Sequence, residues 1–186
     1  MRLFIATTFP VEVLRSVNAR VNPIKPRLPP ASWVRQEAQH LTLAFLGEQP
    51  EAQLEVLAAP LANSLGGIPR FDSRLRGCGF FPNARHARVG WIGLEAERAF
   101  ANVARQVREV AASEGVKLDS VEFRPHLTIM RIRDPWPPAS IDLFSKSFRD
   151  FVSTPFPVDE VILFSSRLDP KGAIHTPLQR FALAAG

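Results

Sequence analysis

The tripeptide His-Leu-Thr occurs twice in this chain, at residues 40–42 and again at 126–128. A double His-x-Thr arises in roughly 0.6 per cent of random orderings of this composition, so the repeat points to a function. In an extended strand alternate side chains share a face. His40 and Thr42 are therefore expected on one face, and His126 and Thr128 on one face of a second strand, with apolar residues anchoring the opposite faces.

Two histidines at such positions can carry out acid–base chemistry. Imidazole gains or loses a proton near neutral pH, so one neutral ring can act as a base while a protonated ring acts as an acid. Threonine hydroxyls can donate to phosphate oxygens, and a nearby arginine such as Arg131 can neutralise charge that develops in the transition state. If the two strands lie side by side or across a cleft, the group suits a tetrahedral anion.

The position of Arg131 raises a geometric requirement. In a regular strand the Arg131 side chain points to the same face as those of Leu127 and Ile129, which are expected to face the core. Its side chain reaches a phosphate only if the strand contains a bulge or ends near this residue.

Other catalytic chemistries have weaker support. No metal site is expected, because His40 and His126 lack the close spacing to a second histidine or a carboxylate that supplies two metal ligands from one element. The chain has no G-x-S-x-G motif, and Cys78 lies in RGCGF without an activating signature, so we expect a small core residue there. His86, in NARHAR, is expected in an exposed turn.

Hydrophobic periodicity surrounds the two motifs with alternating strands and helices. The predicted order is a strand at 3–9, a helix at 11–21, a short strand at 33–34, the first motif strand, a helix at 51–65, extended segments at 71–80 and 87–94, a helix at 99–112, the second motif strand, and strands at 156–168 and 178–183. Pro60 is expected to kink or break its helix, and DPWPP to form a loop. This order predicts an α+β protein with largely antiparallel sheets, arranged as two lobes.

Length and composition limit the class of protein. A chain of 186 residues suits one domain, or two lobes that share a core. The net charge of +5 is compatible with an anionic partner and equally with a mildly basic surface. A single cysteine excludes an intramolecular disulfide and favours a reducing cytoplasm. The opening MRLFIATTFP is too short and polar for a secretory signal, and no apolar run is long enough for a bilayer, so no membrane association is expected.

The stretches HLTLAFLGE and FRPHLTIMR resemble the two H-x-T motifs of the two-histidine (2H) phosphoesterase superfamily. The similarity is strongest to the bacterial and archaeal RNA 2′,3′-cyclic phosphodiesterases, also called 2′-5′ RNA ligases. The opening strand, the central RGCGFFPNARHARVGWIGL and the closing strands resemble the same family. This resemblance implies one bilobal domain over residues 1–186, with two antiparallel sheets around a central cleft and flanking helices.

The resemblance also implies roles for individual residues. His40 matches the family's proton donor and His126 its proton acceptor, while Thr42 and Thr128 match the hydroxyls that hold the phosphate. Arg131 matches the basic residue that follows the second motif. The implied reaction opens the 2′,3′-cyclic phosphate at an RNA end to a 2′-phosphate without a metal or another cofactor, with 2′-5′ RNA ligation as a related activity. Fragments of tRNA are among the candidate substrates, and the protein is expected to be a cytoplasmic monomer.

One departure from the family and two alternatives remain. The family often has tyrosine where this chain has His175, in KGAIHTPL, and the chain contains no tyrosine. His175 either replaces that tyrosine or is a loop residue, and of the two we expect the loop residue. The alternative functions are a non-catalytic module that binds RNA ends and a metal-dependent phosphodiesterase.

Overall fold

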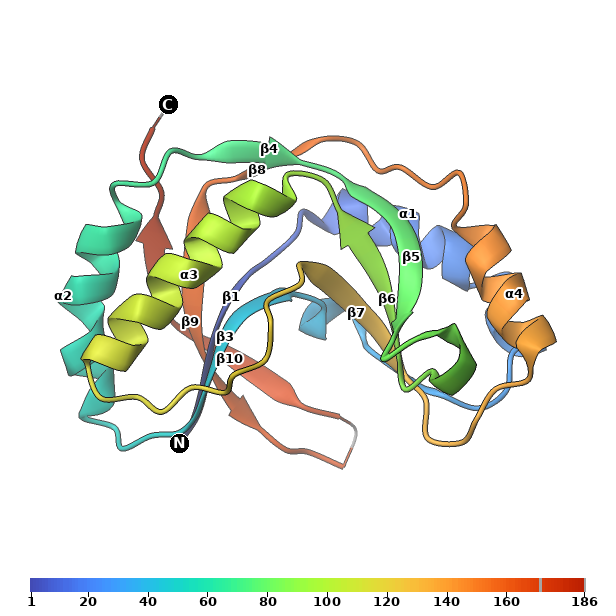
Figure 1. The fold of residues 1–186 in the computed structure, drawn as a ribbon, viewed down its shortest axis with the longest axis horizontal. Coiled ribbons are helices and arrows are strands. Elements are labelled where there is room, and N and C mark those ends of the chain that lie inside the picture. The colour runs from blue at the N-terminus through green and yellow to red at the C-terminus, as the bar shows by residue number, and fades with distance from the viewer. Residues whose placement is uncertain (171, 186) are drawn as a thin grey trace.

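Two four-stranded sheets form the framework of the computed structural model, which describes residues 1–170 and 172–185. Both are antiparallel, and each contains one motif strand (Figure 1). Sheet A has the order β10 (Ile174–Ala182), β9 (Glu160–Arg167), β1 (Arg2–Thr7) and β3 (Leu41–Glu48). Sheet B has the order β2 (Ser32–Trp33), β7 (His126–Arg131), β6 (Val89–Leu94) and β5 (Leu75–Phe81). A separate pair, β4 (Phe71–Ser73) and β8 (Phe156–Val158), runs between the two ends of the molecule.

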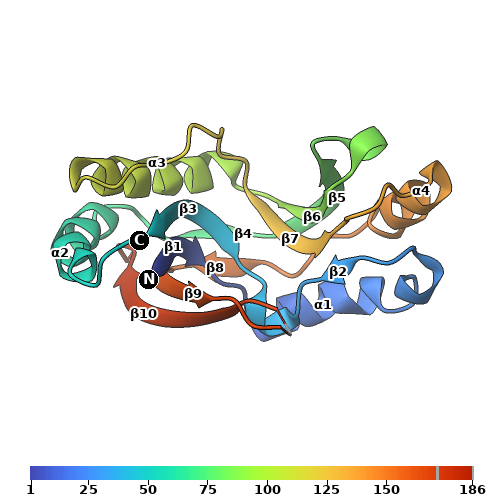
Figure 2. The ribbon, with the colours of Figure 1, turned by 90° about the horizontal axis from the view of Figure 1, so that it is seen from below.

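The helices divide between the two sheets, which confirms the bilobal α+β prediction. Helices α2 (Gln53–Leu65) and α3 (Glu97–Ser113) pack against each other and against sheet A. Helices α1 (Val11–Val21) and α4 (Pro138–Ser147) lie at the end of the molecule that holds sheet B (Figure 2). The 3-10 turns are η1 (Lys25–Arg27), η2 (Gln36–Ala38) and η3 (Ala84–His86). Because α1 follows β1 and α3 follows β6, the chain crosses between the sheets, and each lobe contains both halves of the sequence.

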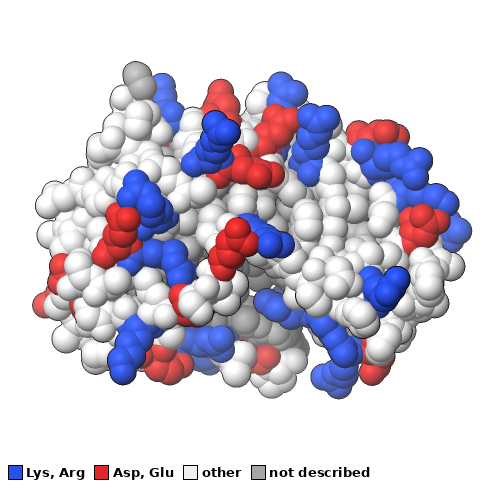
Figure 3. All heavy atoms as spheres, in the orientation of Figure 1, with Lys and Arg blue, Asp and Glu red and all other residues white. Residues whose placement is uncertain are grey.

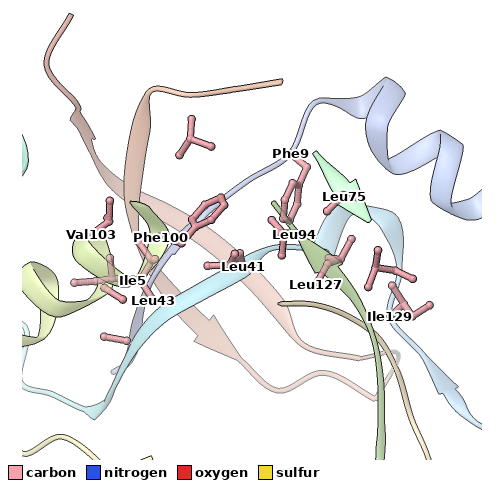
Figure 4. Packing of buried hydrophobic residues seen from close by; sticks show 14 of the residues in the cluster. Ile5, Phe9, Leu41, Leu43, Leu75, Leu94, Phe100, Val103, Leu127 and Ile129 are labelled. Carbon is pink, nitrogen blue, oxygen red and sulfur yellow. The ribbon is translucent and has the colours of Figure 1, made fainter. Parts of the chain in front are cut away.

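One large core holds the two motif strands in place. Leu41 and Leu43 of β3 face the same hydrophobic cluster as Leu127 and Ile129 of β7, and all four side chains are buried (Figure 4). Burial of each such side chain stabilises the fold by about 1.5–3 kcal/mol. The predicted apolar anchors behind the two motifs are therefore present, and β3 and β7 lie in contact with each other.

A bulge in β7 decides where its last residues point. In the pairing with β6, Trp91 lies opposite Thr128 and Gly90 lies opposite Met130, so Ile129 is an extra residue. An extra residue reverses the alternation of faces beyond it. Arg131 therefore lies on the same face of sheet B as Thr128, and it is exposed. This is the bulge that its approach to a phosphate requires.

Several element predictions were wrong. Helix α4 was not predicted; it begins at Pro138, the last residue of DPWPP, where proline is tolerated because the first helical position needs no backbone N–H. Helix α2 continues through Pro60 without the break allowed for there, because proline removes only one intrahelical hydrogen bond donor. The extended segments 71–80 and 156–168 are each divided in two, because β4 and β8 pair with each other while β5 and β9 join the large sheets. The closing strand begins at residue 174, so it includes His175.

Candidate active site

His40 lies just before β3, and two neighbours in its own motif region hold its ring. Its Nδ1 is 2.8 Å from the Ala38 carbonyl oxygen. A carbonyl oxygen can only accept a hydrogen bond, so Nδ1 carries the proton and donates it. The other ring nitrogen, Nε2, is 3.1 Å from the Thr42 hydroxyl oxygen. In the neutral ring, Nε2 is therefore the basic atom.

His126 repeats this arrangement on sheet B. Its Nδ1 is 2.6 Å from the Arg124 carbonyl oxygen, which again belongs to the residue two positions earlier. The same argument leaves Nε2 as the atom that can exchange a proton. The Phe81 ring meets the His126 ring edge-on, at 4.9 Å between centroids. Both motifs thus fix the tautomer of their own histidine through a local backbone carbonyl.

Burial and positive charge favour the neutral forms of both imidazoles. Burial lowers the pKa of His40 to about 4, the Ala38 hydrogen bond opposes this shift, and the charges of His175, Arg131 and His126 add to it. Burial also lowers the pKa of His126, with a further contribution from Arg131. The structure therefore places both histidines within electrostatic reach of Arg131. Near neutral pH, without a bound anion, both imidazoles are therefore neutral and lie near the Arg131 guanidinium.

This arrangement favours an anionic ligand. A bound phosphate adds negative charge next to Arg131, and this charge favours protonation of one imidazole while the other stays neutral. The result is an acid and a base in one site. Thr42 and Thr128 are half-buried on the motif faces, where their hydroxyls can donate to an anion.

Aromatic side chains form much of the rest of the site, and sequence reasoning assigned them no role. On sheet B, Trp91 lies opposite Thr128 and packs against Phe81, with 5.2 Å between the ring centroids. The indole ring occupies the space above Gly79, where a Cβ would lie 2.2 Å from it. Strand register brings these residues together, and the only sequence signal was their alternation along the central hairpin.

His175 belongs to the site, which corrects the prediction that it is a loop residue. It lies on β10, and its ring meets the His40 ring edge-on, with 5.1 Å between centroids and 87° between planes. Phe4 contacts both rings, at 4.8 Å from His40 and 4.9 Å from His175. Strand register explains this position. Phe4 pairs with Phe164, and Phe164 pairs with Pro177, so these three residues lie on one face of sheet A. His175 is two residues before Pro177 in the same strand and therefore shares that face.

The remaining candidates lie outside this group. Cys78 is half-buried against the core, and burial raises the pKa of its thiol to about 11, which disfavours the reactive thiolate. His86 is exposed in η3, as predicted. Within residues 1–170 and 172–185, no three or more His, Cys, Asp or Glu side chains gather where they could hold a metal ion. No helix in the same part of the chain is long and apolar enough to span a bilayer.

Two H-x-T motifs, one on each of two antiparallel sheets, are the arrangement expected of a phosphoesterase of the two-histidine type, and a solved structure described as a phosphoesterase superimposes with a TM-score of 0.71 at 26% identity, covering 98% of each chain. The sequence pattern described as the 2′-5′ RNA ligase superfamily matches residues 13–170. The chain belongs to this superfamily.

Relatives and solved structures agree over the whole chain. A Thermus thermophilus protein named RNA 2′,3′-cyclic phosphodiesterase is 35% identical over 192 residues, covering 98% of this chain and 90% of the relative. A Thermotoga maritima protein of the same name is 30% identical over 189 residues, covering 100% and 97%. The solved structure of TT0787 from Thermus thermophilus superimposes with a TM-score of 0.81 at 31% identity, covering 100% and 99%. E. coli LigT complexed with 3′-AMP gives 0.75 at 27% identity, covering 98% and 97%.

Proposed function

We propose that this protein hydrolyses 2′,3′-cyclic phosphate ends of RNA to 2′-phosphates by acid–base catalysis with two histidines. The observation that carries the proposal is the matched geometry of His40 and His126. Each Nδ1 is bound to a backbone carbonyl, which leaves each Nε2 to exchange a proton, and Arg131 acts on both rings. The names of the relatives support the same substrate.

The proposed reaction is an in-line displacement at phosphorus. His126 Nε2 takes a proton from water as the water oxygen bonds to phosphorus, and the bond from phosphorus to the 3′ oxygen breaks. His40 Nε2 gives its proton to that oxygen, which leaves a 2′-phosphate and a free 3′-hydroxyl. Thr42 and Thr128 hold the non-bridging oxygens, and Arg131 stabilises the charge that develops on them.

The same acid and base serve a related reaction. If the 5′-hydroxyl of another RNA replaces water as the nucleophile, the product is a 2′-5′ phosphodiester, so ligation is a second expected activity. We propose a monomer that acts in the cytoplasm on short RNA ends, including those of tRNA fragments. A non-catalytic RNA-binding module has no need of two proton carriers, and a metal-dependent enzyme needs a ligand cluster; neither alternative is favoured.

The identity of the product tests the proposed direction of proton transfer. The purified protein is incubated with an RNA oligonucleotide that ends in a 2′,3′-cyclic phosphate, and the new end is identified by phosphorus NMR or with a phosphatase specific for 3′-phosphates. We expect a 2′-phosphate, which that phosphatase leaves intact. A 3′-phosphate as the main product would reverse the roles of His40 and His126, and an unchanged cyclic end would refute the hydrolase.

A further inference from the structure

Four rings form a cluster on the face of sheet A that holds the first motif. Its members are Phe4, His40, Phe164 and His175. Phe4 stacks on Phe164, with 5.1 Å between centroids and 10° between planes, and both are buried. This pair forms a flat base under the two imidazoles. The His40 ring lies tilted by 32° over Phe4, while the His175 ring stands edge-on to both neighbours.

We propose that His175 is a positioning residue, which together with Phe4 holds the His40 imidazole with Nδ1 toward Ala38 and Nε2 toward the substrate. This inference rests on the proposed function of His40. The torsion that rotates a histidine ring has broad minima, so one hydrogen bond does not fix the ring plane. Phe4 covers one face of the ring, and His175 closes a second side. Without the ring of His175, His40 can rotate away from its bond to Ala38.

The contact acts through packing of the ring. His175 Nδ1 is buried, and none of the described residues offers it a hydrogen-bond partner. A buried N–H without an acceptor is costly, so the proton belongs on Nε2. Burial lowers the pKa of His175, which keeps it neutral beside a proton-carrying His40. A ring without the imidazole nitrogens should therefore position His40 equally well.

Two substitutions separate a ring effect from an imidazole effect. In His175→Ala we expect kcat to fall roughly tenfold with KM nearly unchanged, because a misplaced acid slows the chemical step more than binding. In His175→Phe we expect kcat within about twofold of the wild-type value. His175→Asn is a second ring-free variant, should the alanine variant unfold. The matched control is Thr176→Ala, because Thr176 is the next residue of β10, is exposed and points to the opposite face.

A spectroscopic readout makes the test independent of turnover. The Nδ1 proton of His40, bound to the Ala38 carbonyl, should give a proton NMR signal in the wild type and in His175→Phe, and a broadened or missing signal in His175→Ala. The proposal is overturned if His175→Ala retains both the signal and kcat, or if His175→Phe loses as much as His175→Ala. An inactive wild type would refute the proposed function instead, and the NMR comparison would still decide the role of His175.

Discussion

At the scale of single residues, the chemistry depends on atoms that the backbone orients. His40 and His126, the two proposed catalytic histidines, each donate from Nδ1 to the carbonyl of the residue two positions earlier, so the H-x-T strand and the segment before it form one unit. Burial then favours the neutral form of both rings when no anion is bound. In the proposed mechanism the acid therefore acquires its proton when an anion binds, so the phosphate of the substrate is expected to help activate the site.

The titration of His40 tests this dependence on the anion. In the free protein, NMR should show the His40 ring titrating with a midpoint near its pKa of about 4, because burial disfavours the charged form. Added inorganic phosphate should raise that midpoint, since a neighbouring negative charge favours the imidazolium ion. A free-protein midpoint near the ordinary value of 6.5, or a midpoint that does not respond to phosphate, contradicts this description of the site.

Substitution of Arg131 should affect both turnover and the histidines. We expect Arg131→Gln to lower kcat/KM by roughly a hundredfold, because a positioned cation stabilises the transition-state charge. The same change should raise the pKa of His40 and of His126, since Arg131 lowers both. Arg131→Lys should lose less activity, because it keeps the charge without the planar guanidinium.

The control for Arg131 removes the same charge elsewhere. Arg98 is exposed on α3, so Arg98→Gln should leave kcat/KM and both histidine titrations unchanged. If Arg131→Gln behaves like Arg98→Gln, Arg131 has no part in the site.

At the scale of strands and helices, register determines which side chains reach the site. The bulge at Ile129 turns Arg131 toward the face of Thr128, and the pairing of β6 with β7 places Trp91 beside the second motif. The absence of a side chain at Gly79 leaves room for the Trp91 ring. The geometry of the second motif therefore depends on residues of neighbouring strands as well as on its own.

A side chain at Gly79 should disturb this wall of the site. Gly79→Ala places a Cβ 2.2 Å from the Trp91 ring, and overpacking of this kind typically costs about 1–3 kcal/mol. We expect a lower free energy of unfolding in urea and slower hydrolysis, because Trp91 lies next to Thr128. In the control Gly67→Ala the new Cβ lies 3.7 Å from the Ser64 carbonyl oxygen, an ordinary contact, so both measurements should stay near wild type. If the two variants are equally stable, the Trp91 ring moves aside without cost, and the prediction that Gly79 fixes its position is wrong.

Local patterns in the sequence predicted the elements better than the contacts between them. The double H-x-T and the apolar residues that alternate with it predicted both motif strands, because the alternation of side chains along a strand depends only on neighbouring residues. The position of His175 was missed because it depends on pairing across β10, β9 and β1. Helix α4 was missed because the prolines of DPWPP predicted a loop in this region. The helical spacing of Ile141, Phe144 and Phe148 was the signal that could have revealed it.

At the scale of the whole molecule, the crossing of the chain brings distant segments to one site. Phe4, His40, His126 and His175 come from regions of the sequence that are far apart, yet all four belong to one site between the sheets. The face shown in Figure 3 carries basic and acidic side chains interspersed, without a continuous band of either sign.

The most direct test of the central claim compares single-histidine variants in the presence of excess chelator. Turnover is measured on RNA ending in a 2′,3′-cyclic phosphate for the wild type, His40→Ala, His126→Ala and the exposed-histidine control His86→Ala. Chelation should leave the wild type and the control fully active, while His40→Ala and His126→Ala should each be slower by roughly 100-fold or more, the usual contribution of one positioned acid or base. Their unfolding temperatures should stay close to wild type. Wild-type turnover in either folded variant, or loss of activity on chelation that added metal restores, would contradict the two-histidine mechanism.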